Sequence, residues 1–274
     1  MRNRRSHYHW CLIHRGLFVF LSVLILNSSV FAQTFSNENA LGKKIKSTSI
    51  TVGYGFFSSS RYEGGKGHTF RSAPFFSLEH KNLSINPISG FRLRLIDRES
   101  WSGGIGVGGS FGRYAKQDPY LSDLGNISWT MEGIIFGKYK AKYYSFTSEI
   151  YRDLLQKGHG GYYWKNSLGT GLPLLNLRIF VRPSLSITYA DINYMNSFFG
   201  VNSSQSSSSG YSEYALSQGI KDISAAILVV YRFSEKVNLS GTLAYKELMA
   251  SVAKSPIVQN KGQFSAGLTL TYLY

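Results

Sequence analysis

The end of the chain alternates between apolar and polar residues. Every second residue is apolar or aromatic: Phe264, Ala266, Leu268, Leu270, Tyr272 and Tyr274. The residues between them are small or polar: Gln263, Ser265, Gly267, Thr269 and Thr271. Because successive side chains of a β-strand point to opposite faces, this period of two predicts a strand with one apolar and one polar face.

The same alternation recurs in the segments 237–245 and 177–189. In the second of these, Arg178 and Arg182 fall on the polar face. Further segments have the length and composition of strands: 48–57, 70–80, 82–86, 90–97, 101–113, 126–138, 141–153, 160–171 and 219–233. The pattern therefore predicts about 12 strands, with 10 as the alternative if 82–86 is not a separate strand.

The connections between these segments sort by length. Counting backward from a C-terminus in the periplasm, the long connections fall on one side: 249–261, 190–218, 154–159, 114–125 and 58–69. The tight turns fall on the other: 234–235, 172–176, 139–140 and 98–100. Bacterial outer-membrane barrels have this division. We therefore expect an all-β fold, a transmembrane antiparallel up-and-down β-barrel over residues 47–274, with the serine tract 203–209 at a mobile loop tip.

The first 32 residues have the pattern of a secretory signal peptide. Four arginines, at positions 2, 4, 5 and 15, precede an uncharged apolar run over 17–26 that is too short to span a bilayer. We expect cleavage between Ala32 and Gln33, with 33–46 forming a short periplasmic tail. The alternative is an uncleaved N-terminal anchor. Cleavage would remove Cys11, the only cysteine, so no thiol chemistry is expected in the mature protein.

Composition supports export to the outer membrane of a Gram-negative bacterium. Aromatic residues make up 15% of the chain, and no apolar run is long enough for a transmembrane helix. Removing the four leader arginines lowers the net charge from +15 to +11. For an exported protein this favours lipid and lipopolysaccharide phosphates as partners over nucleic acid. The aromatic C-terminus, with Leu268, Leu270, Tyr272 and Tyr274 on one face, also resembles the signal read by the barrel-assembly machinery.

No motif of catalysis, cofactor binding or metal binding is evident. The glycine-rich stretch 103–109 lacks the Gly-Lys-Ser/Thr of a phosphate loop and lies in a predicted strand, where glycines allow close packing. His68 and His80 have no recognisable partner, and His159 is expected to be a solvent-facing loop residue. The acidic residues Asp97, Glu99, Asp118 and Asp123 are too scattered for a metal site.

Several charges are expected inside the barrel. Glu132 and Glu149 fall on polar-face positions of adjacent strands. Basic residues do so elsewhere: Arg92, Arg94, Arg178, Arg182 and Lys246. Because buried charges need partners, these residues predict either a network that plugs the barrel or the lining of a small anion-preferring pore. The alternation leaves both open.

Several segments together resemble the MipA/OmpV family of outer-membrane barrels. The first contains Tyr194, Phe199, Gly200 and Val201. It is followed by Ser209 and Gly210, by Gly219-Ile220-Lys221-Asp222, and by Ser255, Pro256, Ile257 and Val258. The resemblance implies a non-enzymatic scaffold that joins a lytic transglycosylase to a penicillin-binding murein synthase. Other members are discussed as porin-like proteins, adhesins or antigens, so a small-solute channel and a surface adhesin are the alternatives.

Overall fold

The computed structural model describes residues 48–175 and 178–274. The expected leader, its cleavage site at Ala32 and Gln33, and the tail 33–46 lie outside the described residues.

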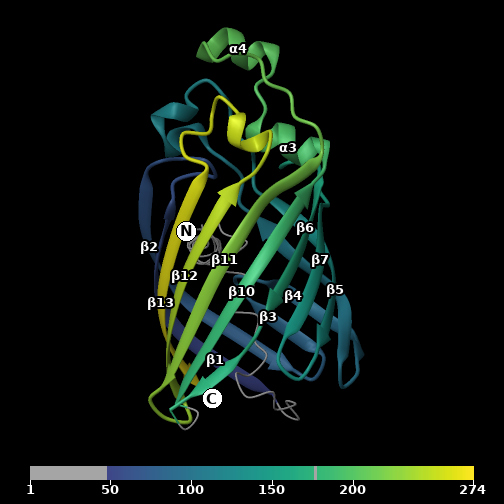
Figure 1. The fold of residues 1–274 in the computed structure, drawn as a ribbon, viewed down its shortest axis with the longest axis vertical. Coiled ribbons are helices and arrows are strands. Elements are labelled where there is room, and N and C mark those ends of the chain that lie inside the picture. Colours follow the sequence, from purple (N-terminus) through teal and green to yellow (C-terminus); the bar gives the residue numbers. More distant parts are fainter. Residues whose placement is uncertain (1–47, 176–177) are drawn as a thin grey trace, which may run out of the picture.

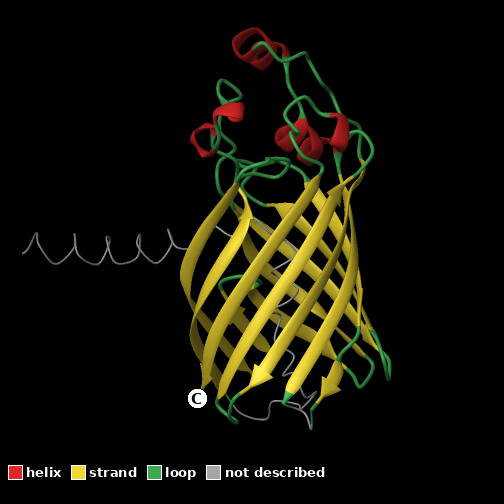
Figure 2. Cartoon of the chain, turned by 60° about the vertical axis from the view of Figure 1, so that its left-hand side comes forward, coloured by secondary structure: helices red, strands yellow, loops and turns green. Residues whose placement is uncertain are grey.

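Twelve antiparallel strands close into a barrel (Figures 1 and 2). They are β1 (Ser49–Ser60), β2 (His68–His80), β3 (Leu83–Asn86), β4 (Gly90–Asp97), β5 (Trp101–Ser110), β6 (Thr130–Lys140), β7 (Ser145–Asp153), β8 (Tyr162–Gly169), β10 (Ile179–Ala190), β11 (Gly219–Arg232), β12 (Val237–Leu248) and β13 (Gly262–Leu273). Consecutive strands of this series pair with each other, and β1 pairs with β13 to close the ring. The prediction of twelve strands, including the short strand before Pro87, is confirmed.

One further strand was not predicted. β9 (Leu172–Leu174) falls where the sequence predicts a tight turn, and it pairs with Ile179–Val181 of β10. β8 pairs with the rest of β10 from Ser184 onward. Pro183 lies between the two pairings, and a proline offers no backbone N–H to a neighbouring strand. The pairing along this edge of β10 is therefore interrupted at Pro183, between β9 and β8.

Alternation sets which side chains enter the barrel. In β13, Gln263, Ser265 and Thr269 are buried, whereas Leu268 and Leu270 are exposed on the outside. The same parity holds in β12, where Ser240 and Thr242 are buried and Leu243 is exposed. The polar faces predicted from the sequence are thus the inner faces. No helix within the described ranges is long and apolar enough to span a membrane.

The helices lie at the end of the barrel that carries the long loops (Figure 2). α3 (Ile192–Phe199) and α4 (Ser203–Ser209) belong to the connection between β10 and β11. Three short 3-10 helices lie in other connections: η1 (Ala115–Gln117), η2 (Pro119–Leu121) and η3 (Val252–Lys254). The serine tract, expected as a loop tip, forms α4 because Asn202 caps its N-terminus and Gly210 ends it with φ 77°.

Candidate functional site

Helix α3 lies at the mouth of the barrel, at the end that carries the long loops (Figures 1 and 2). Asp191 caps it by accepting the backbone N–H of Tyr194 at 2.9 Å. Its buried face consists of Tyr194, Met195, Phe198 and Phe199. This face packs against residues from the wall and from two other loops: Ile127, Ile134, Tyr151, Tyr163, Ala190, Leu216, Leu248 and Val252. The long loops therefore form a packed cap with its own apolar core.

The family-motif residues meet in this cap although they are far apart in the sequence. The Ser255 hydroxyl donates a hydrogen bond to the carbonyl oxygen of Phe199 at 2.6 Å. Val201 and Ile257 share a buried cluster with Tyr62, Leu121 and Leu124. The Tyr62 hydroxyl donates to the Ile257 carbonyl at 2.9 Å, and burial raises the pKa of this tyrosine to about 12. The motif segments 194–201 and 255–258 thus hold the cap together, whereas Ser209 and Gly210 lie at the end of α4.

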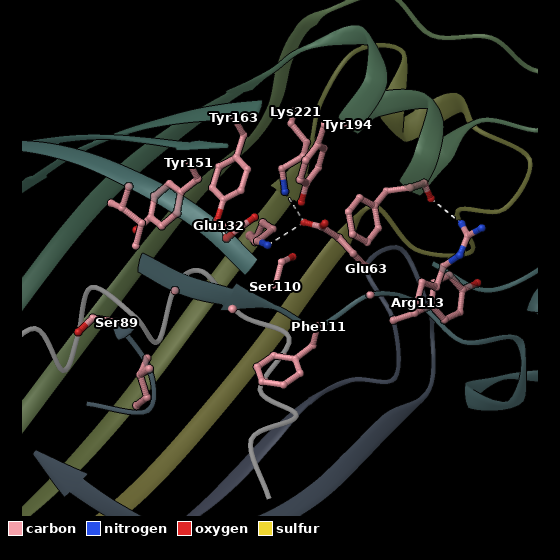
Figure 3. A pocket seen from close by; sticks show the side chains of 18 of the residues that line it. Glu63, Ser89, Ser110, Phe111, Arg113, Glu132, Tyr151, Tyr163, Tyr194 and Lys221 are labelled. Atoms are coloured by element: carbon pink, nitrogen blue, oxygen red, sulfur yellow. Dashed lines mark hydrogen bonds and ion pairs between the residues drawn. The ribbon is translucent and has the colours of Figure 1, made fainter. Parts of the chain in front are cut away.

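A carboxylate from the first loop joins the cap to the barrel wall. Glu63 lies in the connection between β1 and β2, and Figure 3 shows it pointing toward Lys221 of β11. It also pairs with Lys246 of β12. One of its oxygens accepts from the Lys221 ammonium at 2.7 Å and from the Lys246 ammonium at 2.8 Å. Burial would raise the pKa of Glu63, but the two lysines outweigh it and lower the pKa to about 2. Glu63 is therefore ionised over the physiological pH range.

A second ion pair crosses the lumen beneath the cap. Arg92 of β4 pairs with Glu149 of β7 and donates to the Tyr151 hydroxyl at 3.1 Å. Its guanidinium also lies 5.2 Å from the ring centre of Phe136. Gly106 makes room for it, because a Cβ there would lie 3.1 Å from Cγ of Arg92. The glycine stretch of β5 is thus a close-packing surface, as the sequence predicts.

The third polar group contains a histidine that the sequence led us to expect in solvent. His159 is only 2% exposed, and its Nε2 lies 2.9 Å from Glu132 Oε1. The Tyr163 hydroxyl donates to the other Glu132 oxygen at 3.3 Å. The expectation of a solvent-facing loop histidine is therefore wrong. Its loop folds inward because Asp153 accepts the backbone N–H groups of Gln156 at 2.8 Å and Gly160 at 2.8 Å.

Of the other three arginines expected in the lumen, two lie on strands and one lies in a turn. Arg94 lies on β4 and donates to the Lys81 carbonyl at 2.8 Å. Arg182 occupies an inward position of β10, two residues before Ser184 on the same face. Arg178 does not: β10 begins at Ile179, so Arg178 is exposed in the turn before the strand. The strand was expected two residues too early.

Three charged residues of this network, Glu63, Lys221 and Asp222, were not predicted from the sequence to lie in the lumen. Glu63 lies in a loop, where alternation assigns no face. Lys221 and Asp222 are adjacent in the chain, yet both are buried, because the register between β10 and β11 shifts after Thr188. The Lys221 ammonium lies 2.8 Å from the Asp222 carboxylate. The segment Gly219-Ile220-Lys221-Asp222, part of the family resemblance, is the signal in the sequence for these two residues.

A cavity of about 130 Å³ lies between the cap and the lumen charges. Figure 3 shows Glu63, Lys221 and Tyr194 on one side of it and Ser110 and Phe111 on the other. Aromatic rings form much of its lining: Tyr62, Phe111, Tyr151, Tyr163, Tyr194 and Phe198. The cavity is thus ringed by aromatic side chains around a paired carboxylate.

The charged groups around the cavity are engaged by neighbouring side chains. Within 48–175 and 178–274 no group of three or more His, Cys, Asp or Glu side chains is placed to hold a metal ion. The carboxylate of Glu63 is engaged by lysines and that of Glu132 by His159 and Tyr163. Arg113, in the loop after β5, is buried and donates to the Phe198 carbonyl at 2.6 Å. Burial lowers the pKa of Arg113 to about 10.

Known proteins resemble the chain in sequence and in structure. The sequence profile of a family described as MltA-interacting protein MipA matches residues 52–274. No curated protein matches the chain. Solved structures that it resembles include the NanC porin, with 8% identity and a TM-score of 0.41, over 82% of this chain and 99% of that chain.

Two other solved structures show a comparable likeness. An outer membrane channel from Pseudomonas putida F1 has 12% identity and a TM-score of 0.42, over 83% of this chain and 96% of that chain. The CymD monoaromatic hydrocarbon channel has 9% identity and a TM-score of 0.41, over 90% of this chain and 93% of that chain. At these identities the likeness concerns the fold alone.

Proposed function

Because the chain belongs to the MltA-interacting protein (MipA) family, we propose that it is a non-enzymatic outer-membrane barrel, closed at its capped mouth, that holds a lytic transglycosylase and a penicillin-binding murein synthase at the cell envelope. The support comes from three parts of the molecule: its outer surface, its capped mouth and the turns at its other end.

The outer surface supports insertion into a bilayer. Outward positions of neighbouring strands carry exposed apolar side chains, among them Tyr54, Phe56, Leu185, Ile187, Ile227, Leu243, Leu268 and Leu270. A continuous apolar belt of this kind is unfavourable in water. In hydrocarbon it is favourable, since a closed ladder of strands pairs most of the backbone polar groups within the barrel.

The capped mouth is the observation that carries the proposal of a closed scaffold. Met195 and Phe199 of α3, Leu248 at the end of β12 and Val252 of η3 are all at most 1% exposed. They pack in one cluster with wall residues that face the lumen. An open pore would need water along this route. The packed cap and the paired charges below it therefore favour a barrel that presents surfaces to partners.

The turns opposite the cap offer a surface for a periplasmic partner. They carry exposed aromatic residues, with Tyr143 71% and Phe233 56% exposed. Basic residues lie beside them: Lys142 in the same turn as Tyr143, and Lys236 in the same turn as Phe233. Aromatic side chains flanked by positive charge suit a partner with an acidic surface.

The scaffold is tested by reconstituting the barrel in detergent and measuring binding of the purified transglycosylase and synthase. The double variant Lys142→Glu, Lys236→Glu reverses charge on the periplasmic turns, and we expect it to weaken binding at least tenfold. The double variant Lys116→Glu, Lys254→Glu, a matched reversal in η1 and η3 at the capped end, should leave binding unchanged. Equal binding by all three proteins would contradict docking through these turns, and failure of the native barrel to bind either enzyme would contradict the scaffold itself.

A small-solute channel is the second candidate, favoured by the excess of basic residues on the inner faces of the strands. These are Arg71, Arg92, Arg94, Lys138, Lys140, Lys165, Arg182, Lys221, Arg232 and Lys246, against Glu79, Asp97, Glu132, Glu149, Asp153 and Asp222. Such a lining would favour anions. Discrete, salt-dependent current steps from the native protein in a planar bilayer would support the channel, and silent bilayers would exclude it.

A further inference from the structure

The wall of the barrel is interrupted beside β3. This strand has only four residues and pairs with β2 no farther than Leu78. Toward the capped end of the barrel, β2 continues for ten further residues to His68. One edge of this part of β2 pairs with β1. On the other side of the interruption, β5 extends beyond its last pair with β4 at Val107 and continues to Ser110 along β6. No described strand bridges β2 and this end of β5.

Contacts above and below enclose the interruption. It is therefore a gap within the wall between β2 and β5, which we call the window, and not an opening at the barrel rim. Above it, the loop after β1 reaches the loop after β5. Arg61 and Asp118 form an ion pair at 3.5 Å there, and Tyr62 packs with Leu121 and Leu124. These contacts close the top of the frame.

The turn between β3 and β4 closes the bottom. Asn86 fixes it by accepting the backbone N–H groups of Ile88 at 3.0 Å and Ser89 at 2.7 Å. Ile88 packs on the inward side chains of Phe57 and Phe75. The turn is therefore held inside the barrel and below the window.

The local sequence fits a strand edge at this point. Pro74 lies midway along the part of β2 beside the window, paired with Tyr54 of β1. Proline is tolerated where its missing N–H would face an open edge. Gly108 and Gly109 lie on the β5 side and place no side chain there.

The cavity borders this window at its lower frame and on its β5 side. Its lining includes Pro87, Ile88 and Ser89 from the lower frame and residues 108–113 from the β5 side. The rest of the lining is the aromatic and charged ring beneath the cap. The cavity therefore extends from the window to the ion pair between Glu63 and Lys221 (Figure 3).

The surroundings of the window indicate what could enter. Outward side chains on both sides are apolar and exposed, with Phe70 85% and Phe91 44% exposed. If the barrel lies in a bilayer, as the proposed function holds, this region faces hydrocarbon. Irregular backbone at that depth is tolerated where it is buried in protein or lines a cavity, because unpaired polar groups are strongly disfavoured in lipid.

We propose that the window between β2 and β5 is a lateral port through which a small aromatic solute with one polar group, such as a phenol, passes from the lipid phase into the cavity. The rings of Tyr151, Tyr163, Tyr194 and Phe198 pack on the solute ring, and the ionic cluster of Glu63 with its two lysines receives the polar group. A cavity of about 130 Å³ is close in size to a cavity of roughly 150 Å³ that holds benzene. This port is independent of the murein scaffold but rests on membrane insertion.

Binding is tested with 4-fluorophenol and fluorine NMR on the full barrel in lipid nanodiscs. Gly108→Leu places a side chain on the inner, cavity-lining side of β5, where a Cβ would meet only Ile134 at 3.2 Å. We expect it to weaken binding at least tenfold. The matched control is Gly137→Leu in β6, where a Cβ would meet no atom within 4 Å, and it should bind as the native protein does. Equal affinity of the two variants, or no binding by the native barrel, would overturn the proposal.

The route of entry is tested by a separate measurement, the exchange rate of bound 4-fluorophenol. Gly109→Leu narrows the outer side of the window, next to Trp129, whose Nε1 would lie 2.9 Å from the added Cβ. We expect the exchange rate of bound 4-fluorophenol to fall at least fivefold while its affinity stays within twofold of native. Unchanged exchange would exclude the lateral route. A heat-dependent shift on a gel and protease protection in nanodiscs check barrel formation and insertion separately, so a failure of insertion is distinguishable from a failure of the port.

Discussion

At the scale of single residues, Glu63 connects the parts of the molecule most directly. It lies in a loop of the cap, and its carboxylate accepts from lysines on two adjacent strands, β11 and β12. With an exposed fraction of 18% for its side chain, the carboxylate is shielded from most of the solvent. A buried ion pair contributes little when compared with an apolar replacement, but breaking one half of it is costly.

We predict that Glu63→Gln loosens the cap. The substitution leaves the Lys246 ammonium without its carboxylate and removes one of the two carboxylates at Lys221, a loss of about 3 kcal/mol. The midpoint of the heat-dependent gel shift should fall by several degrees. Glu247→Gln is the matched control, because Glu247 pairs with Lys261 at 2.9 Å on the exposed surface, and it should leave the midpoint unchanged. Equal midpoints for all three proteins would show that Glu63 does not hold the cap.

The same residue predicts a pH dependence. The pKa of Glu63 is lowered from 4.5 to about 2, so its stabilising effect is fully present above pH 4.5 and is lost as the pH falls toward 2. The difference in thermal midpoint between the native protein and Glu63→Gln should therefore be constant above pH 5 and shrink below pH 4.5. A difference that persists undiminished to pH 2 would assign the effect of the variant to something other than this charge.

The sequence predicts which side of the wall a strand residue faces, but not which residue it meets. Alternation assigned Arg92, Glu132 and Glu149 to polar faces, and in the structure Glu132 and Glu149 are buried and Arg92 pairs with Glu149. The partner of Arg92 is 57 residues away across the lumen, a separation that follows from barrel closure rather than from local pattern. His159 and Glu63 lie in loops, where no period assigns a face, so their burial was not predictable in this way.

At the scale of elements, α3 determines whether the mouth is closed. It is a short helix, and helices of its length are marginal on their own, so its stability comes from packing and from its Asp191 cap. The local sequence reads as a polar and aromatic loop. The helix was therefore recognisable only as a family motif, whereas strands with clear alternation were predicted to within a few residues.

We predict that Phe199→Ala opens the cap without unfolding the barrel. Phe199 is fully buried, and truncation of such a side chain costs about 3–5 kcal/mol. Limited proteolysis should then cut within residues 191–218 at least tenfold faster. Ile192→Ala removes a side chain that is 52% exposed on the same helix and should have little effect. Similar cleavage rates in both variants would mean that the core of the cap does not depend on α3.

At the scale of the whole molecule, two features oppose each other. The ring of twelve strands encloses a lumen wider than that of an eight-stranded barrel, which side chains alone can fill. Basic residues predominate on the inner faces of the strands. The cap covers that lumen with a packed apolar core. Ring closure and strand number could be predicted from sequence, because both follow from alternation and loop lengths. The packing of the cap could not, since it joins segments as distant as Tyr62 and Ile257.

We predict that removal of the cap converts the barrel into a pore with weak anion preference. The variant replaces residues 192–217 by a short Gly-Ser connection, which removes α3 together with the buried Leu216 and exposes the basic lumen to water. Planar-bilayer recording should then show discrete current steps whose reversal potential in a salt gradient favours anions. The matched control deletes only residues 203–209, because α4 has no buried residue and its loss leaves the core of the cap in place, so it should remain silent. Silence from both variants would show that the lumen is blocked below the cap, whereas current from both would show that α4 is needed for closure.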